Sequence, residues 1–126
     1  MLEITALSAA VLTMLMTGLS LNVSRLRIRH RQSYGDGNHA DLRVAIRLHG
    51  NTLEQSVLFL VLLMVWEMSQ PNMSAVVVAS GVFVFSRLLY VAGVQTRRLA
   101  IRQGAHVLTL ACQLAACIGL IMKVVA

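Results

Sequence analysis

Four polar residues recur at helical spacing in the middle of an otherwise apolar sequence. They are Arg43, Arg47, Asn51 and Glu54. Successive members are four, four and three positions apart, so all four fall within an arc of roughly 80° on one side of a helix. Guanidinium groups offer forked donors to carboxylates, an amide can donate, and a carboxylate can accept from an ammonium group. This stripe therefore suits a small zwitterion with more than one carboxylate.

A second polar group follows further along the chain. At helical spacing it comprises Arg87, Tyr90, Val94 and either Arg97 or Arg98, and Arg102 stands where the last apolar segment begins. Together the two groups could surround an anionic ligand. None of their side chains is a nucleophile, so any chemistry would have to be brought by the ligand.

These residues also have structural interpretations. The side chains of Arg43, Arg97 and Arg98 can extend to lipid phosphates. Arg47 and Glu54 can form an ion pair between helices, and Tyr90 can anchor a helix at the membrane interface.

The remaining histidines and cysteines give no metal-site pattern. Cys112 and Cys117 lie five positions apart in an apolar run, without CxxC spacing or neighbouring metal ligands, and are interpreted as small core or lipid-facing residues. His49 and His106 are interpreted as helix residues with satisfied polar atoms. We therefore expect no metal.

The composition indicates a membrane protein. Of the 126 residues 57% are hydrophobic and 13% are charged, and a soluble fold of this length could not bury so much apolar surface. In a soluble protein the net charge of +6 would suggest a nucleic-acid partner. The charges, however, lie at the ends of long apolar segments, which favours membrane lipid and argues against nucleic acid.

Four membrane-spanning helices are predicted within a single domain, 1–126. Their ranges are roughly 3–32, 40–68, 72–96 and 102–124. The second and third reach the roughly 20 residues needed to cross the bilayer only by carrying polar side chains into it. These are Arg47, Asn51 and Glu54 in the second helix and Arg87 in the third. Such groups usually face a bundle interior or a watery cavity and mark function. The predicted fold class is thus an all-α, integral membrane four-helix bundle.

The arginines predict the orientation. Every arginine lies around the first or the third connection, whereas Glu3, Glu67 and Lys123 lie on the opposite side. The positive-inside rule then places both basic connections and the polar groups at the cytosolic face and both termini outside. Trp66 is predicted to anchor its helix at the outer interface, and Gln70-Pro71-Asn72 to form a short external turn.

The stripe also carries a resemblance to a known family. Arg47-Leu48-His49-Gly50-Asn51-Thr52-Leu53-Glu54, followed by an apolar run, resembles the R-x-H-x-N-x-x-E motif of the MAPEG family, the membrane-associated proteins in eicosanoid and glutathione metabolism. Three further segments are similar to it: Arg25-Leu26-Arg27, Tyr34-Gly35-Asp36-Gly37 and Ser86-Arg87-Leu88-Leu89-Tyr90-Val91-Ala92-Gly93. The resemblance covers essentially the whole chain and looks like that of a small bacterial member.

This resemblance implies a homotrimer in the bacterial inner membrane that binds glutathione, as co-substrate, between neighbouring subunits. With Arg87 from the second polar group, the candidate glutathione-binding residues are Arg25, Arg29, Arg47, Asn51, Glu54, Arg87 and Tyr90. Arg102 matches the arginine that stabilises the glutathione thiolate in catalytic members and is the candidate catalytic residue. A cation beside a thiol lowers the pKa of that thiol.

The implied function is that of a microsomal-type glutathione transferase or peroxidase, which conjugates a lipophilic electrophile or reduces a lipid hydroperoxide. The alternative is a non-catalytic lipid- or glutathione-binding scaffold of the same fold, because the family includes a non-catalytic arachidonate-binding member. Two departures bear on the choice of ligand. Val94 stands where catalytic eukaryotic members often carry a second tyrosine, and Ser56 and Val57 stand where the family often has proline.

Overall fold

The computed structural model describes residues 1–69 and 72–126 and contains four helices. These are α1 (Glu3–His30), α2 (Ala40–Met68), α3 (Met73–Gln95) and α4 (Leu99–Val125). Each is long and apolar enough to cross a membrane. The predicted all-α fold of four membrane-spanning helices is confirmed.

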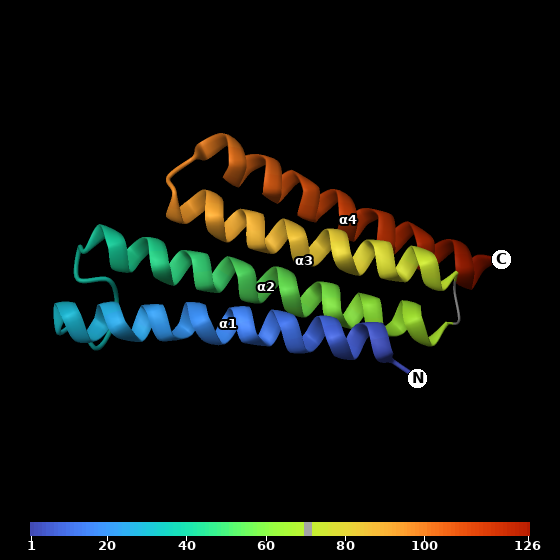
Figure 1. Ribbon diagram of the computed structural model, residues 1–126, viewed down its shortest axis with the longest axis horizontal. Coiled ribbons are helices and arrows are strands. Elements are labelled where there is room, and N and C mark those ends of the chain that lie inside the picture. Colours follow the sequence, from blue (N-terminus) through green and yellow to red (C-terminus); the bar gives the residue numbers. More distant parts are fainter. Residues whose placement is uncertain (70–71) are drawn as a thin grey trace.

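The helices lie side by side as two hairpins, α1 with α2 and α3 with α4 (Figure 1). The α1–α2 and α3–α4 connections lie at one end of the bundle, and both chain termini lie at the other. We call the former the basic end, defined by connections 31–39 and 96–98 and the adjoining helix turns. Within the described part of the chain α1 contacts α2 and α3 but not α4.

The largest apolar core lies away from the basic end. Its fully buried centre includes Phe59 of α2 and Phe83 of α3, whose rings stack with centroids 3.8 Å apart. Trp66 belongs to the same core, and a Cβ on Gly119 of α4 would lie 2.9 Å from its ring. The prediction that Trp66 anchors α2 at the interface is wrong, because packing against α4 leaves it only 7% exposed. Two smaller apolar clusters lie further toward the basic end.

The end opposite the basic end is held by a buried carboxylate. Glu67, near the end of α2, accepts hydrogen bonds from the backbone N–H groups of Ile4 (3.1 Å) and Thr5 (2.8 Å) and from the Thr5 hydroxyl (2.6 Å). These N–H groups have no acceptor within α1, and a carboxylate there also suits the positive end of the helix dipole. Glu67 therefore caps α1 and ties it to α2.

The turn predicted at 70–72 lies largely outside the described residues, which exclude Gln70 and Pro71. Asn72 is described and caps α3, because its side-chain oxygen accepts from the N–H of Ser74 at 3.0 Å.

Both helices that end at the basic end close with the same backbone motif. The residues after the last helical turns, Arg31 and Arg97, are left-handed, with φ of 52° and 56°. In each case the residue after the arginine donates its backbone N–H to the carbonyl five residues earlier. The N–H of Gln32 donates to the carbonyl of Arg27 and the N–H of Arg98 to the carbonyl of Gly93, both at 3.0 Å. Glycine is usual at this position, and a left-handed arginine costs about 1 kcal/mol. Replacing either arginine by glycine should thus preserve the backbone.

Candidate functional site

A cavity of about 500 Å³ at the basic end brings most of the predicted site residues together. Arg47, Asn51 and Glu54 of α2, Tyr90 of α3 and Arg102 of α4 all line it. Its volume lies within the range of small-ligand sites. We call it the polar cavity.

The charged groups of the polar cavity are not neutralised by one another. Among residues 1–69 and 72–126 the only ion pairs join His30 to Asp41 and Arg43 to Asp36. Within the single chain Arg47 and Glu54 do not pair with each other. Arg47, Glu54 and Arg102 are all exposed in the single chain. Two cations and one carboxylate are thus available to a ligand.

Arg87 lies behind the polar cavity and does not line it. The side chain is fully buried, and its guanidinium donates to the Asn51 side-chain oxygen at 3.1 Å and to the Thr109 hydroxyl. It also lies over the ring of Tyr90, with Cζ 4.7 Å from the ring centroid. Because Arg87 occupies the oxygen of the Asn51 amide, the amide nitrogen is the group left for a ligand carboxylate. Arg87 thus orients two lining residues.

Arg102 is positioned by a close approach of α4 to α3. A Cβ on Gly93 would lie 2.7 Å from the backbone nitrogen of Arg102 and 3.0 Å from its Cα. Only a residue without a side chain fits there. Gly93 therefore allows the first turn of α4 to bring Arg102 beside Tyr90 and the α2 stripe.

His106 is a lining residue that the sequence analysis missed. It lies one turn after Arg102, its ring centroid is 6.1 Å from that of Tyr90, and its buried Nδ1 has no hydrogen-bond partner among the described residues. The interpretation of His106 as a satisfied helix residue is therefore wrong. The four-residue spacing from Arg102 was the available signal, because it puts both side chains on one face of the helix.

A second cavity, of about 760 Å³, adjoins the polar cavity and shares Val44, Leu48, Val94 and Arg102 with it. Arg25 and Arg29 of α1 line this second cavity and not the first. Apart from Arg87, which lines neither cavity, the predicted glutathione-binding residues are thus divided between two cavities within one chain.

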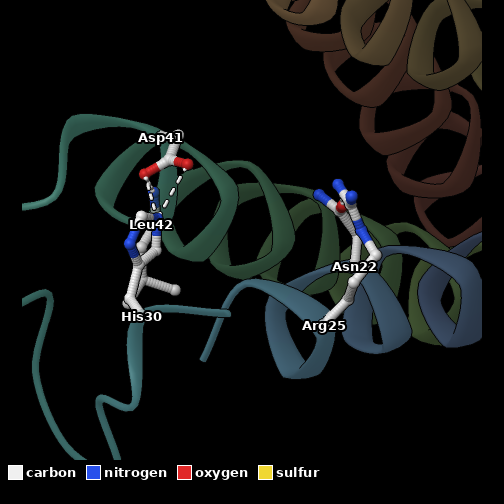
Figure 2. Close-up of polar contacts among 5 residues, drawn as sticks. All are labelled: Asn22, Arg25, His30, Asp41 and Leu42. Carbon is white, nitrogen blue, oxygen red and sulfur yellow. Dashed lines mark hydrogen bonds and ion pairs between the residues drawn. The ribbon is translucent and has the colours of Figure 1, made fainter. Parts of the chain in front are cut away.

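Two polar contacts border the second cavity, one within α1 and one between α1 and α2. Figure 2 shows Arg25 donating to the side-chain oxygen of Asn22 at 2.9 Å. It also shows the ring of His30 facing the carboxylate of Asp41, with Nε2 2.9 Å from both oxygens. Asp41 is therefore already paired, whereas Arg25 meets only a neutral amide.

Arg43, the first member of the stripe, holds connection 31–39 and lines neither cavity. Its Nε donates to the Asp36 carboxylate at 2.6 Å. This hydrogen bond, followed by one from the backbone N–H of Asn38, lowers the pKa of the Asp36 carboxyl below its ordinary value. The connection thus uses Arg43 as a structural cation.

In the part of the chain that the structure describes, no three histidine, cysteine, aspartate or glutamate side chains are placed to hold a metal ion. The groups available at the basic end are mainly hydrogen-bond donors and cations. Such a set suits carboxylates and phosphates rather than metals.

Comparison with known proteins identifies the family. The model of the MAPEG family matches residues 5–122, so this chain belongs to the MAPEG family, as the stripe motif predicted. It is similar to the inner membrane protein YecN of Escherichia coli strain K12, with 34% identity over 94 residues, which are 75% of this chain and 72% of YecN. YecN of Escherichia coli O6:H1 matches with the same identity and coverage. No solved structure matches the chain at a significant level.

Proposed function

We propose that this chain is a glutathione-dependent membrane transferase or peroxidase acting on a lipophilic electrophile or lipid hydroperoxide. The observation that carries the proposal is the polar cavity, where Arg47, Asn51, Glu54, Tyr90 and Arg102 meet from three helices. Membership of a family named for glutathione metabolism supports the same ligand.

The groups in the polar cavity match those of glutathione, which carries two carboxylates, one ammonium group and one thiol. Arg47 and the amide nitrogen of Asn51 would bind a carboxylate, and Glu54 would accept from the ammonium group. The Tyr90 hydroxyl would donate a further hydrogen bond. The carboxylates of glutathione thus match the arginines of the cavity, and its ammonium group matches Glu54.

Arg25 or Arg29 would complete the site from a neighbouring subunit. Both arginines line the other cavity of their own chain, so a contact with glutathione in the polar cavity is expected across an interface. We therefore propose a homotrimer in which glutathione binds between subunits.

Arg102 would activate the thiol. The guanidinium favours the thiolate, and the thiol proton leaves to solvent. The thiolate then attacks the electrophilic carbon of the acceptor, whose leaving group departs with the bonding electron pair. In the peroxidase reaction it attacks the terminal hydroperoxide oxygen instead, the O–O bond breaks, and the alkoxide leaves and is protonated to the alcohol. The thiol of a second glutathione then attacks the sulfur of the resulting sulfenic acid and gives the disulfide and water.

We propose that the basic end faces the cytosol and that both termini lie on the other side of an inner membrane. The positive-inside rule supports the orientation, and the similarity to YecN, an inner membrane protein, supports the membrane. Cytosolic glutathione would then reach the polar cavity from its own compartment.

A non-catalytic glutathione- or lipid-binding scaffold is the second candidate. The observation that favours it is Val94, which lines both cavities where catalytic eukaryotic members often carry a second tyrosine. A valine gives the ligand an apolar contact and no hydrogen bond.

Glutathione binding to the detergent-purified protein tests the proposal, followed by ultraviolet absorbance of the bound thiolate and conjugation of chlorodinitrobenzene. We expect saturable binding, weakened by Arg47→Ala, and a loss of thiolate in Arg102→Ala that exceeds its loss of binding. Arg31→Ala is the matched control, because Arg31 is exposed and lines neither cavity. Absence of saturable binding would refute both the enzyme and a glutathione-binding scaffold, and binding without thiolate formation would select the scaffold.

A further inference from the structure

The second cavity holds a cluster of cations with little opposing charge. Its lining includes Arg25, Arg29, Arg97, Arg98 and Arg102. Asp41 is the only carboxylate among the lining residues, and His30 lies 2.9 Å from it. Five arginines facing one cavity repel one another unless an anion lies between them. The cluster therefore favours a bound anion.

The backbone adds further donors to the same cavity. Helix α4 begins at Leu99, and the side chain of its N-cap residue, Arg98, makes no capping hydrogen bond. The first backbone bond within the helix runs from the N–H of Arg102 to the carbonyl of Arg98, so the preceding N–H groups have no helical acceptor. Arg98 and Leu99 both line the cavity. The positive end of the α4 dipole thus reinforces the arginines.

Apart from Asn22 and Gln95, the remaining lining is apolar. Leu26, Ala45, Leu48, Val94 and Leu99 face the cavity from all four helices. The cavity also lies where the membrane-spanning helices end, which is the depth of lipid headgroups. A soluble anion would gain nothing from these apolar walls, whereas an amphiphile would use both them and the cations.

We infer that the second cavity binds an anionic phospholipid of the leaflet at the basic end. Its phosphodiester is held by Arg97, Arg98 and the free backbone N–H groups at the start of α4, and its glycerol and first acyl carbons lie against the apolar wall. This lipid site is additional to the proposed glutathione site. Arg102 and Val94 line both cavities, so a lipid bound here would lie beside the proposed thiolate.

Arg97→Gly tests the inference without disturbing the fold. Arg97 is left-handed, and glycine adopts that conformation freely, so the variant loses only the guanidinium. Arg31→Gly is the matched control, because Arg31 has the same conformation, closes α1 in the same way, carries the same charge and lines neither cavity. Both variants should unfold at or above the wild-type temperature.

Native mass spectrometry of the detergent-purified protein measures the lipid retained as phosphatidylglycerol or phosphatidylcholine is added. We expect retention of phosphatidylglycerol over phosphatidylcholine, weakened about tenfold in Arg97→Gly and less than twofold in Arg31→Gly, because one charge-assisted hydrogen bond is lost only in the former. Equal weakening in the two variants, or equal retention of the two lipids, would overturn the inference.

Two competition measurements separate the lipid from soluble anions. Inorganic phosphate should displace phosphatidylglycerol only at far higher concentration than the lipid, because phosphate lacks the apolar contacts. Displacement at a similar concentration would show a site for a soluble anion. Glutathione should not displace the lipid, and displacement would assign the cavity to glutathione and overturn the inference. A protein that retains phosphatidylglycerol selectively but binds no glutathione would refute the proposed function alone.

Discussion

Substituting alanine for Gly93 should move Arg102 while keeping its charge. The variant therefore tests how much of the activity depends on where the guanidinium lies. The new Cβ would lie 2.7 Å from the Arg102 backbone nitrogen, about 0.7 Å inside ordinary van der Waals contact. The neighbouring atoms belong to the backbone of Ile101 and Arg102 and cannot rotate away. The start of α4 must therefore shift by several tenths of an ångström, and the guanidinium with it.

The expected magnitudes follow from that shift. Overpacking costs about 1–3 kcal/mol, partly offset by the roughly 1 kcal/mol that alanine gains over glycine inside a helix. A misplacement of about 1 Å can lower a rate by about a hundredfold, so a tenfold to hundredfold loss of conjugation rate is expected. Glutathione affinity should fall less, because Arg47, Asn51 and Glu54 lie on α2.

Conjugation kinetics and glutathione binding, measured side by side on the detergent-purified variant, check this prediction. Gly81→Ala is the control, because Gly81 lies on the same helix and nothing lies within 4 Å of a Cβ there. It should be neutral or slightly stabilising. A Gly93→Ala protein with wild-type turnover would refute the reasoning that this close approach positions Arg102.

Three further predictions concern the supports of the fold. Glu67→Gln should destabilise the protein by about 1–2 kcal/mol in thermal unfolding, because the amide loses the charge that caps α1, while glutathione binding at the other end stays unchanged. Lowering the pH should protonate Asp36 and release Arg43. The pKa of Asp36 is lowered by folding, so its stabilisation is complete above its unfolded pKa and is lost as the pH falls through the folded value, and Asp36→Asn should abolish this pH dependence. Arg87→Lys should lower both thermal stability and glutathione affinity, because a single ammonium group cannot reproduce the two-sided guanidinium contact with α2 and α4. Unchanged glutathione affinity would show that Arg87 does not orient Asn51.

The sequence predicted the four helices and the α2 stripe because both depend on local patterns. A bilayer requires long apolar helices, and side chains three or four positions apart share a helix face whatever the helix packs against. Arg47, Asn51 and Glu54 could therefore be grouped from their spacing alone. Their meeting with Tyr90 and Arg102 was expected from the family motif and is found in the fold.

The rest depends on how the helices pack, which hydropathy does not encode. In a membrane helix the core face and the lipid face are both apolar, so the burial of Trp66 against Gly119 leaves no pattern in the sequence. The separation of Arg25 and Arg29 from the polar cavity depends on how α1 packs against α2 and α3. The hydrogen bond from Arg87 to Thr109 likewise depends on how α4 packs against α3.

The buried Arg87 also constrains how the chain enters the membrane. An arginine in a membrane helix costs up to about 3 kcal/mol at insertion, and the oxygens that accept its hydrogen bonds here belong to two other helices. When α3 leaves the ribosome, α2 is already present, but Thr109 has not been synthesised. A chain cut within connection 96–98 would leave one side of the guanidinium without an acceptor. The hydrogen bonding of Arg87 is therefore complete only once α4 has packed against α3.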